Sequence, residues 1–210
     1  MSDFDDLIKK RRSIRKYKPD FLPAELIEKM IFAATLAPSP SNTQPVRFIR
    51  ISSAKIKEKL HQALINGHKK FLAAVTKPET KKLKAKINAY RRFSEFMFKA
   101  PALFAVGYAR DVTGGFSKTL FDAGIISEDK RSTINYDITT GLCLKNFILK
   151  GEDMGISSCI LTGPLVFIPN AEEICGIDDI CIRCFLTAGF PDEKPGFIER
   201  KKISELYRSV

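Results

Sequence analysis

The sequence predicts a mixed α+β fold that contains both helices and strands. Two observations support this class: apolar residues recur at helical spacing in several stretches, and short apolar runs of strand length lie between them. The chain has 210 residues, of which 44% are hydrophobic and 28% charged, so it can bury one substantial core. We therefore expect a single domain over residues 1–210.

Two helices are predicted at the start of the chain. Ser2 can cap the first, and the four basic residues at 9–12 suit its negative end. Its apolar residues are expected to be buried: Phe4, Leu7 and Ile8. Pro23 suits the first turn of the second helix, and Pro38 prevents its continuation. The expected core stripe of the second helix consists of Leu26, Ile27, Met30, Ile31 and Ala34.

A strand is predicted at 46–51, and two further helices follow it. The spacing of Ile56, Leu60 and Leu64 marks a third helix, which we expect to end at Gly67. The next helix is rich in lysine, and its apolar residues lie at helical spacing: Leu83, Ile87, Tyr90 and Met97. We therefore interpret its lysines as the solvated face of an amphipathic helix.

The net charge of +11, from 35 basic and 24 acidic residues, raises the question of nucleic-acid binding. Residues 69–92 alone contribute +8, with nine lysines or arginines against one acid, Glu79. No zinc-finger spacing, aromatic-studded RNA-binding strand or GXXG clamp accompanies them, so we expect no nucleic-acid partner. A basic nucleic-acid-binding domain without catalytic activity remains the alternative function.

The second half of the chain predicts three strands and a central helix. The apolar stretches at 102–108, 158–161 and 181–190 indicate strands, and a short helix at 172–175 connects the last two. Residues 136–154 indicate the central helix, in which Gly141 and Gly151 permit close packing on a neighbouring helix. The sequence TGGFSKT at 113–119 lacks the glycine that precedes the lysine of a phosphate-binding loop, so we expect a turn there.

Secretion, membrane insertion and metal binding have no support in the sequence. The N-terminus is acidic where a secretory signal is cationic, and no segment is apolar enough to span a bilayer, so we expect a cytoplasmic protein without a membrane partner. The C-x-x-C pair at 181–184 lacks a second pair and lies in a predicted strand. We expect all five cysteines to be buried small residues: Cys143, Cys159, Cys175, Cys181 and Cys184. His61 and His68 are too few for a metal centre and are expected to be structural or exposed.

Common nucleotide-binding and hydrolase motifs are absent, but four segments form one pattern. They are RRSIRKY at 11–17, APSPSNTQPVRF at 37–48, GISSCILTGP at 155–164 and ERKKISELY at 199–207. In this order, and over essentially the whole chain, they resemble the FMN-dependent nitroreductase family. The resemblance implies a three-layer α/β/α sandwich with a mostly antiparallel central sheet.

The resemblance also implies an FMN site. The FMN phosphate carries about −1.5 to −2 charges, and arginine offers it two parallel donors. Arg11 and Ser13 are expected to bind phosphate and ribityl oxygens, and Arg15 to lie near N1 of the flavin ring. The full set of expected cofactor-binding residues is Arg11, Arg12, Ser13, Arg15, Pro38, Ser39, Pro40, Asn42, Leu161, Thr162, Gly163, Arg200 and Lys201.

By the same resemblance, the loop at 38–45 contacts the flavin of a second subunit, which implies a homodimer with shared active sites. The implied activity passes hydride from NAD(P)H to a small electron-poor acceptor, a nitro compound, quinone or enone, by a ping-pong mechanism. The flavin carries the chemistry, so no catalytic side chain is expected. Val46, the Thr162-Gly163-Pro164 stretch and the Lys201-Lys202-Ile203 stretch depart from the common family pattern and bear on acceptor preference.

Overall fold

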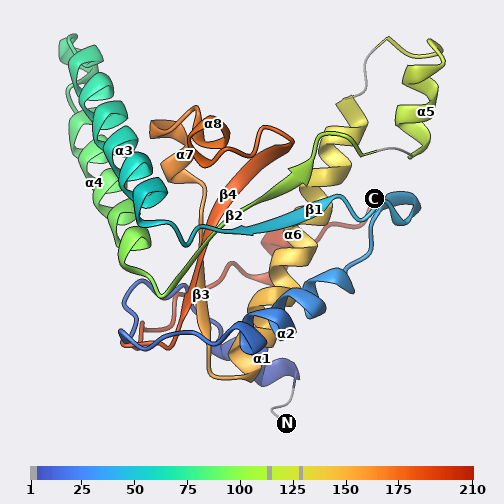
Figure 1. The fold of residues 1–210 in the computed structure, drawn as a ribbon, viewed down its shortest axis with the longest axis horizontal. Coiled ribbons are helices and arrows are strands. Elements are labelled where there is room, and N and C mark those ends of the chain that lie inside the picture. Colours follow the sequence, from blue (N-terminus) through green and yellow to red (C-terminus); the bar gives the residue numbers. More distant parts are fainter. Residues whose placement is uncertain (1–3, 113–114, 128–129) are drawn as a thin grey trace.

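A computed structural model describes residues 4–112, 115–127 and 130–210 of the chain (Figure 1). The helices are α1 (Phe4–Lys10), α2 (Ala24–Thr35), α3 (Ala54–Ala74), α4 (Leu83–Glu95), α5 (Phe116–Asp122), α6 (Lys130–Asp153), α7 (Gly163–Phe167), α8 (Ala171–Cys175) and α9 (Ile203–Leu206). The strands are β1 (Val46–Arg50), β2 (Ala102–Ala109), β3 (Ser157–Leu161) and β4 (Ile180–Gly189). Short 3₁₀ helices lie at Pro40–Asn42 (η1), Pro78–Thr80 (η2) and Phe96–Lys99 (η3).

The four strands form one antiparallel sheet in the order β1-β2-β4-β3. Strand β2 is buried along its whole length, because helices cover both faces of the sheet. Its side chains alternate between two cores: Phe104 and Val106 enter one, and Leu103 and Ala105 enter the other. The predicted α+β class, with an antiparallel sheet between two helical layers, is confirmed.

Helices α2 and α6 form the layer over the first face. Phe147 of α6 stacks on Phe48 with ring centroids 5.3 Å apart and meets Phe104 edge to face at 5.8 Å. A Cβ added at Gly151 would lie 2.6 Å from the Met30 side chain, so the predicted role of Gly151 in helix packing is confirmed. The same prediction for Gly141 is not confirmed within one chain, because Gly141 is exposed and no helix among the described residues packs against it there.

Helices α3, α4, α7 and α8 lie on the opposite face (Figure 1). The prediction that the third helix ends at Gly67 is wrong, since α3 continues to Ala74. A Cβ at Gly67 would lie 2.1 Å from the carbonyl oxygen of Phe167. The glycine is therefore required for the close approach of α7, and it does not terminate the helix.

The structure differs from the predictions at α1, at α5 and at the start of α6. Phe4 and Ile8 are 61% and 41% exposed and Leu7 is only half-buried, because α1 lies at the edge of the fold beside α6. Ser2 lies outside the described residues. Residues 116–122 form helix α5 where a turn was expected, and 113–114 lie outside the described residues. Helix α6 begins at Lys130, six residues before the predicted start.

The cysteines are all free thiols, and three of them are buried: Cys143, Cys159 and Cys184. Burial raises the pKa of Cys184 to about 12. The prediction of five buried cysteines is wrong for Cys175 and Cys181, which are half-buried because they lie at the end of α8 and the start of β4. Among the described helices, none combines the length and the hydropathy needed to cross a bilayer.

Candidate functional site

The basic segment at 11–17 runs along the start of β3. The amide of Ile14 donates a hydrogen bond to the Ser158 carbonyl at 3.3 Å, and Ile14 itself is buried. The Tyr17 hydroxyl donates to the Ile14 carbonyl at 2.6 Å and lies 2.8 Å from the hydroxyl of Thr187 in β4. Burial raises the pKa of Tyr17 above its ordinary value, so the phenol stays protonated and keeps both contacts.

This path brings Arg11, Ser13 and Arg15 together beside Cys159. Burial raises the pKa of the Cys159 thiol, and the positive charges of Arg15 and Arg11 and a hydrogen bond with Ser13 oppose that shift. In the described part of the chain, no carboxylate lies within ion-pair distance of the Arg11 or Arg15 guanidinium. These cations are therefore available to an anionic ligand.

Orphaned polar atoms gather at the same place. Ser158 Oγ, Arg12 Nε and Glu152 Oε1 are buried without a hydrogen-bond partner among the described residues. Burial raises the pKa of Glu152, against the hydrogen bond with Ser157 and the charges of Arg11 and Arg12. Buried polar atoms in folded proteins are nearly always paired, so the Ser158 hydroxyl and the Arg12 Nε–H, which can both donate, fit a site that binds a polar group, whereas an ionised Glu152 would oppose an anion.

Two further side chains hold the segment in place. Arg12 Nη1 donates to the carbonyls of Lys9 at 2.6 Å and Arg11 at 2.9 Å, and its guanidinium lies 5.5 Å from the centre of the Phe197 ring. Arg12 therefore caps the C-terminus of α1, and its cofactor role stays a prediction. The Glu193 carboxylate accepts hydrogen bonds from the Arg15 and Lys16 amides, an anchor that sequence reasoning missed because Glu193 carries no motif.

The loop at 38–45, the proline loop, contains Pro38, Ser39, Pro40 and Asn42 of the expected site. Ser41, Asn42 and Gln44 have positive φ angles of 51°, 52° and 44°. The Ser39 hydroxyl accepts a hydrogen bond from the Gln44 amide at 3.0 Å and helps to hold this conformation. Such strain in non-glycine residues is concentrated at functional sites, and it supports a binding role for the loop.

Within one chain the proline loop does not meet the arginine cluster. Ser39 and Thr139 line the same cavity of about 530 Å³, so the loop lies beside the middle of α6. The charges of Arg11 and Arg12 act on Glu152, at the C-terminal end of that helix. Because an α-helix rises about 1.5 Å per residue, Thr139 and Glu152 are separated by about 20 Å along its axis.

The junction of β3 and α7 contains three more of the expected cofactor-binding residues. Leu161 ends β3 and is buried, and Thr162 and Gly163 begin α7. In the described residues the Thr162 amide has no backbone acceptor, so it can donate to a ligand. A Cβ at Gly163 would lie 3.4 Å from the Tyr90 ring, an ordinary van der Waals contact, so Gly163 lies directly beside Tyr90.

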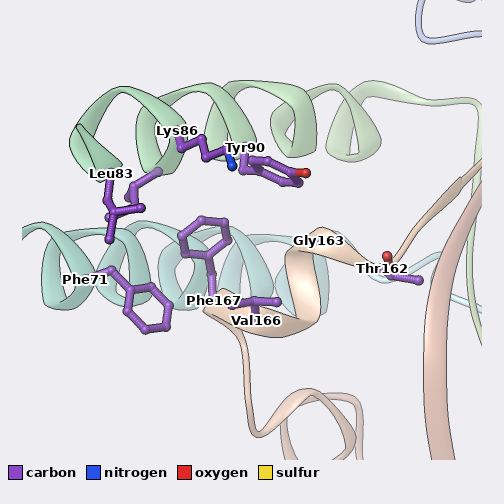
Figure 2. A pocket seen from close by; sticks show the side chains of 9 residues that line it. Phe71, Leu83, Lys86, Tyr90, Thr162, Gly163, Val166 and Phe167 are labelled. Atoms are coloured by element: carbon purple, nitrogen blue, oxygen red, sulfur yellow. The ribbon is translucent and has the colours of Figure 1, made fainter. Parts of the chain in front are cut away.

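A cavity of about 480 Å³ begins at this junction and extends between α3, α4 and α7 (Figure 2). Its walls are mostly apolar and include Phe71, Leu83, Ile87 and Phe167, with Lys86 and Tyr90 contributed by α4. The lysines of α4 are exposed as predicted. Of the predicted apolar stripe, Met97 lies in η3 and is fully buried in the core, whereas Leu83, Ile87 and Tyr90 line the cavity. Leu83 and Tyr90 are 45% and 55% exposed.

The structure does not bring the C-terminal residues to the arginine cluster. Arg200 and Lys201 are exposed, and no described hydrogen bond or ion pair connects them to Arg11 or Ser13. The tail around them also exposes apolar side chains, among them Ile198, Ile203 and Leu206. The place of Arg200 and Lys201 in the site stays a prediction.

The histidines take no part in this site. His68 is buried with its Nε2 2.7 Å from Asn88 Oδ1, and His61 packs on the Phe98 ring with centroids 4.8 Å apart. Over the described residues, no group of three or more His, Cys, Asp and Glu side chains is placed to hold a metal ion.

Comparisons with known proteins agree with this geometry. A putative NAD(P)H nitroreductase of Bacillus subtilis is 25% identical over 206 residues, which cover 98% of this chain and 93% of the relative. The crystal structure of a BluB-like flavoprotein from Clostridium difficile 630 superposes with a TM-score of 0.79 and 26% identity, covering 100% of both chains. A putative nitroreductase in complex with FMN from Desulfovibrio desulfuricans has a TM-score of 0.68 at 18% identity, with 100% of this chain and 98% of that one covered.

The family model of the nitroreductases matches residues 8–190. That range contains the basic segment, the proline loop and the β3–α7 junction, and it excludes Arg200 and Lys201. The chain belongs to the nitroreductase family.

Proposed function

We propose that this chain is an FMN-dependent oxidoreductase that passes hydride from NAD(P)H to an electron-poor acceptor such as a nitro compound, a quinone or an enone. The observation that carries the proposal is the cluster of Arg11, Ser13 and Arg15, whose cations have no described carboxylate partner and whose surroundings contain orphaned polar atoms. The relative named as an NAD(P)H nitroreductase and the similar structure in complex with FMN support the same donor and cofactor.

The residues of the chain bind the cofactor and hold its ring in position. Arg11 and Ser13 hold the phosphate and ribityl oxygens, Arg15 places positive charge at the edge of the ring, and the Thr162 amide donates to the ring. The chemistry that bound FMN would supply is hydride transfer from the donor to the acceptor. Donor and acceptor share the space beside Thr162 in turn, which makes the mechanism ping-pong. The apolar cavity walls offer that space a surface for flat rings.

The active unit is a homodimer with shared sites. Ile134, Ile138 and Leu142 lie at i, i+4 and i+8 on α6 and are 45%, 58% and 40% exposed, which forms an apolar stripe. In the proposed dimer a second copy covers this stripe, and the proline loop of one copy completes the arginine cluster of the other. This arrangement accounts for the separation of about 20 Å between the two elements along α6 in one chain.

The location and domain predictions complete the proposal. One sheet is shared by both cores, which supports a single domain over residues 1–210. The cytoplasm is the proposed compartment, where free thiols such as the five cysteines persist.

The decisive experiment is the absorption spectrum of the purified protein. We expect a yellow protein with flavin absorbance that releases FMN on denaturation and is bleached by NADH or NADPH under anaerobic conditions. A colourless protein that neither binds added FMN nor quenches its fluorescence contradicts the proposal. Salt-sensitive binding of that colourless protein to DNA would then favour the nucleic-acid alternative.

The two arginines are expected to differ in effect. Arg11→Ala should lower FMN affinity about 10- to 100-fold, because it removes charge-assisted hydrogen bonds to phosphate, and should leave the potential of the bound flavin unchanged. Arg15→Ala should lower that potential by about 30 mV or more, because reduction adds negative charge near this cation. Fluorescence titration and anaerobic redox titration measure the two effects.

Lys16→Ala is the matched control for both variants. Lys16 is exposed in the same segment, and its replacement removes the same unit of charge. We therefore expect the FMN affinity and the potential of the bound flavin to stay close to those of the wild-type protein. If both arginine variants lose affinity equally and keep the wild-type potential, the placement of Arg15 at the ring is wrong.

A further inference from the structure

The cavity beside Thr162 contains one charged side chain among its lining residues. Figure 2 shows the Lys86 side chain extending from α4 toward Tyr90, across the cavity from the Phe167 ring. In the described part of the chain, no carboxylate lies within ion-pair distance of the Lys86 amine. Lys86 is exposed, so its amine is free to meet an anion at the cavity while the apolar walls favour an apolar ligand.

The surroundings of the cavity carry the same sign of charge. Residues 69–92, which include the end of α3 and most of α4, carry a net charge of +8, and nearly all of these basic side chains are exposed. Figure 1 shows that α3 and α4 form a hairpin that projects from the sheet. A field of one sign beside a cavity raises the local concentration of oppositely charged ligands.

We propose that the electron acceptor of this enzyme is a flat, apolar ring compound bearing a carboxylate, and that Lys86 binds the carboxylate. The ring occupies the space between Phe167 and Tyr90, and the cavity of about 480 Å³ is within the range of small-molecule sites. Thr162 and Gly163, where the proposed flavin lies, border the same cavity, so the reducible group reaches the site of hydride transfer. The inference rests on the proposed function and assigns its substrate class.

The test compares two nitro compounds that differ only in charge, (4-nitrophenyl)acetate and (4-nitrophenyl)acetamide. The methylene group separates the nitro ring from the charge, so the reactivity of the two nitro groups is closely matched. With the FMN-loaded protein and NADPH we expect kcat/KM for the carboxylate to exceed that for the amide about tenfold. In Lys86→Gln this ratio should fall to about one through a higher KM, since one charge-assisted contact contributes about that factor.

Two matched variants separate contact from general charge. Lys84→Gln removes an exposed lysine of the same helix that does not line the cavity. In this variant the ratio of kcat/KM for the carboxylate to that for the amide should stay at least half of the wild-type ratio. Lys86→Arg keeps the charge and should keep the preference. If Lys84→Gln and Lys86→Gln lose the preference equally, the field of the hairpin alone accounts for it and the contact to Lys86 is overturned.

Binding without turnover gives an independent readout. Calorimetry on the oxidised, FMN-loaded protein should give phenylacetate an affinity about tenfold higher than phenylacetamide, and Lys86→Gln should remove the difference. Equal affinities of the wild-type protein for phenylacetate and phenylacetamide overturn the inference. The inference is also overturned if Lys86→Gln slows only the reduction of the flavin by NADPH and leaves the binding of both compounds unchanged. Failure of the proposed function is distinct, because the protein would then hold no FMN and reduce neither nitro compound.

Discussion

The Ile138→Glu variant is expected to sediment as a monomer and to lose most of its bound FMN. Ile138 is 58% exposed in the middle of the apolar stripe of α6, and in the proposed dimer it is buried against the second copy. A two-fold interface would contain the new carboxylate twice, and an unpaired buried charge costs about 3–5 kcal/mol. The proline loop and the arginine cluster would then no longer share a site. Sedimentation velocity at micromolar concentration and flavin absorbance measure both losses.

Phe93→Glu is the control for this prediction. Phe93 is 61% exposed on α4, on the opposite side of the sheet from α6, so the variant introduces the same charge at an equally exposed apolar position. We expect it to remain a dimer. A monomeric wild-type protein that retains FMN, or a dimeric Ile138→Glu protein with full flavin content, contradicts the proposed interface.

Gly67→Ala is expected to destabilise the protein by up to about 2 kcal/mol. Its Cβ would lie 2.1 Å from the Phe167 carbonyl oxygen, and backbone cannot move aside as a flexible side chain can. Overpacking typically costs about 1–3 kcal/mol, and alanine returns about 1 kcal/mol of helix propensity relative to glycine. Because α7 lines the cavity beside Thr162, the displacement should also weaken acceptor binding. Urea denaturation and KM measure the two effects.

The neighbouring Asn66→Ala variant gives the baseline. Asn66 is exposed on α3, and its side chain accepts a hydrogen bond from Gln62 at 3.0 Å, so its replacement should change stability by about 0.5 kcal/mol or less. A Gly67→Ala protein as stable as Asn66→Ala would show that α3 and α7 can separate at little cost.

The spacing of apolar residues along the sequence was sufficient to predict most of the helices and strands. The stripe of α2 is packed in the core, with Ile27, Met30 and Ala34 fully buried, because its period matches the helix and its neighbours are apolar. The strands also lie within one residue of the predicted ranges, since β2 is a continuous apolar run buried on both faces and β4 is apolar and buried over most of its length. The family was recognisable for a similar reason: the basic segment, the proline loop and the β3–α7 junction are short and contiguous in the sequence.

Tertiary contacts decided the rest. The sequence by itself determined which residues can form helices, strands and a cationic segment, because propensity and periodicity depend on neighbours along the chain. It could not distinguish Gly67 as a contact with Phe167 from a helix stop, or show that Leu83 and Tyr90 line a cavity. Nor could it show that Arg12 caps α1, whereas Arg11 and Arg15 remain without a carboxylate partner in the described residues. Burial and pairing depend on residues far apart in the sequence, and only the packed fold brings those residues into contact.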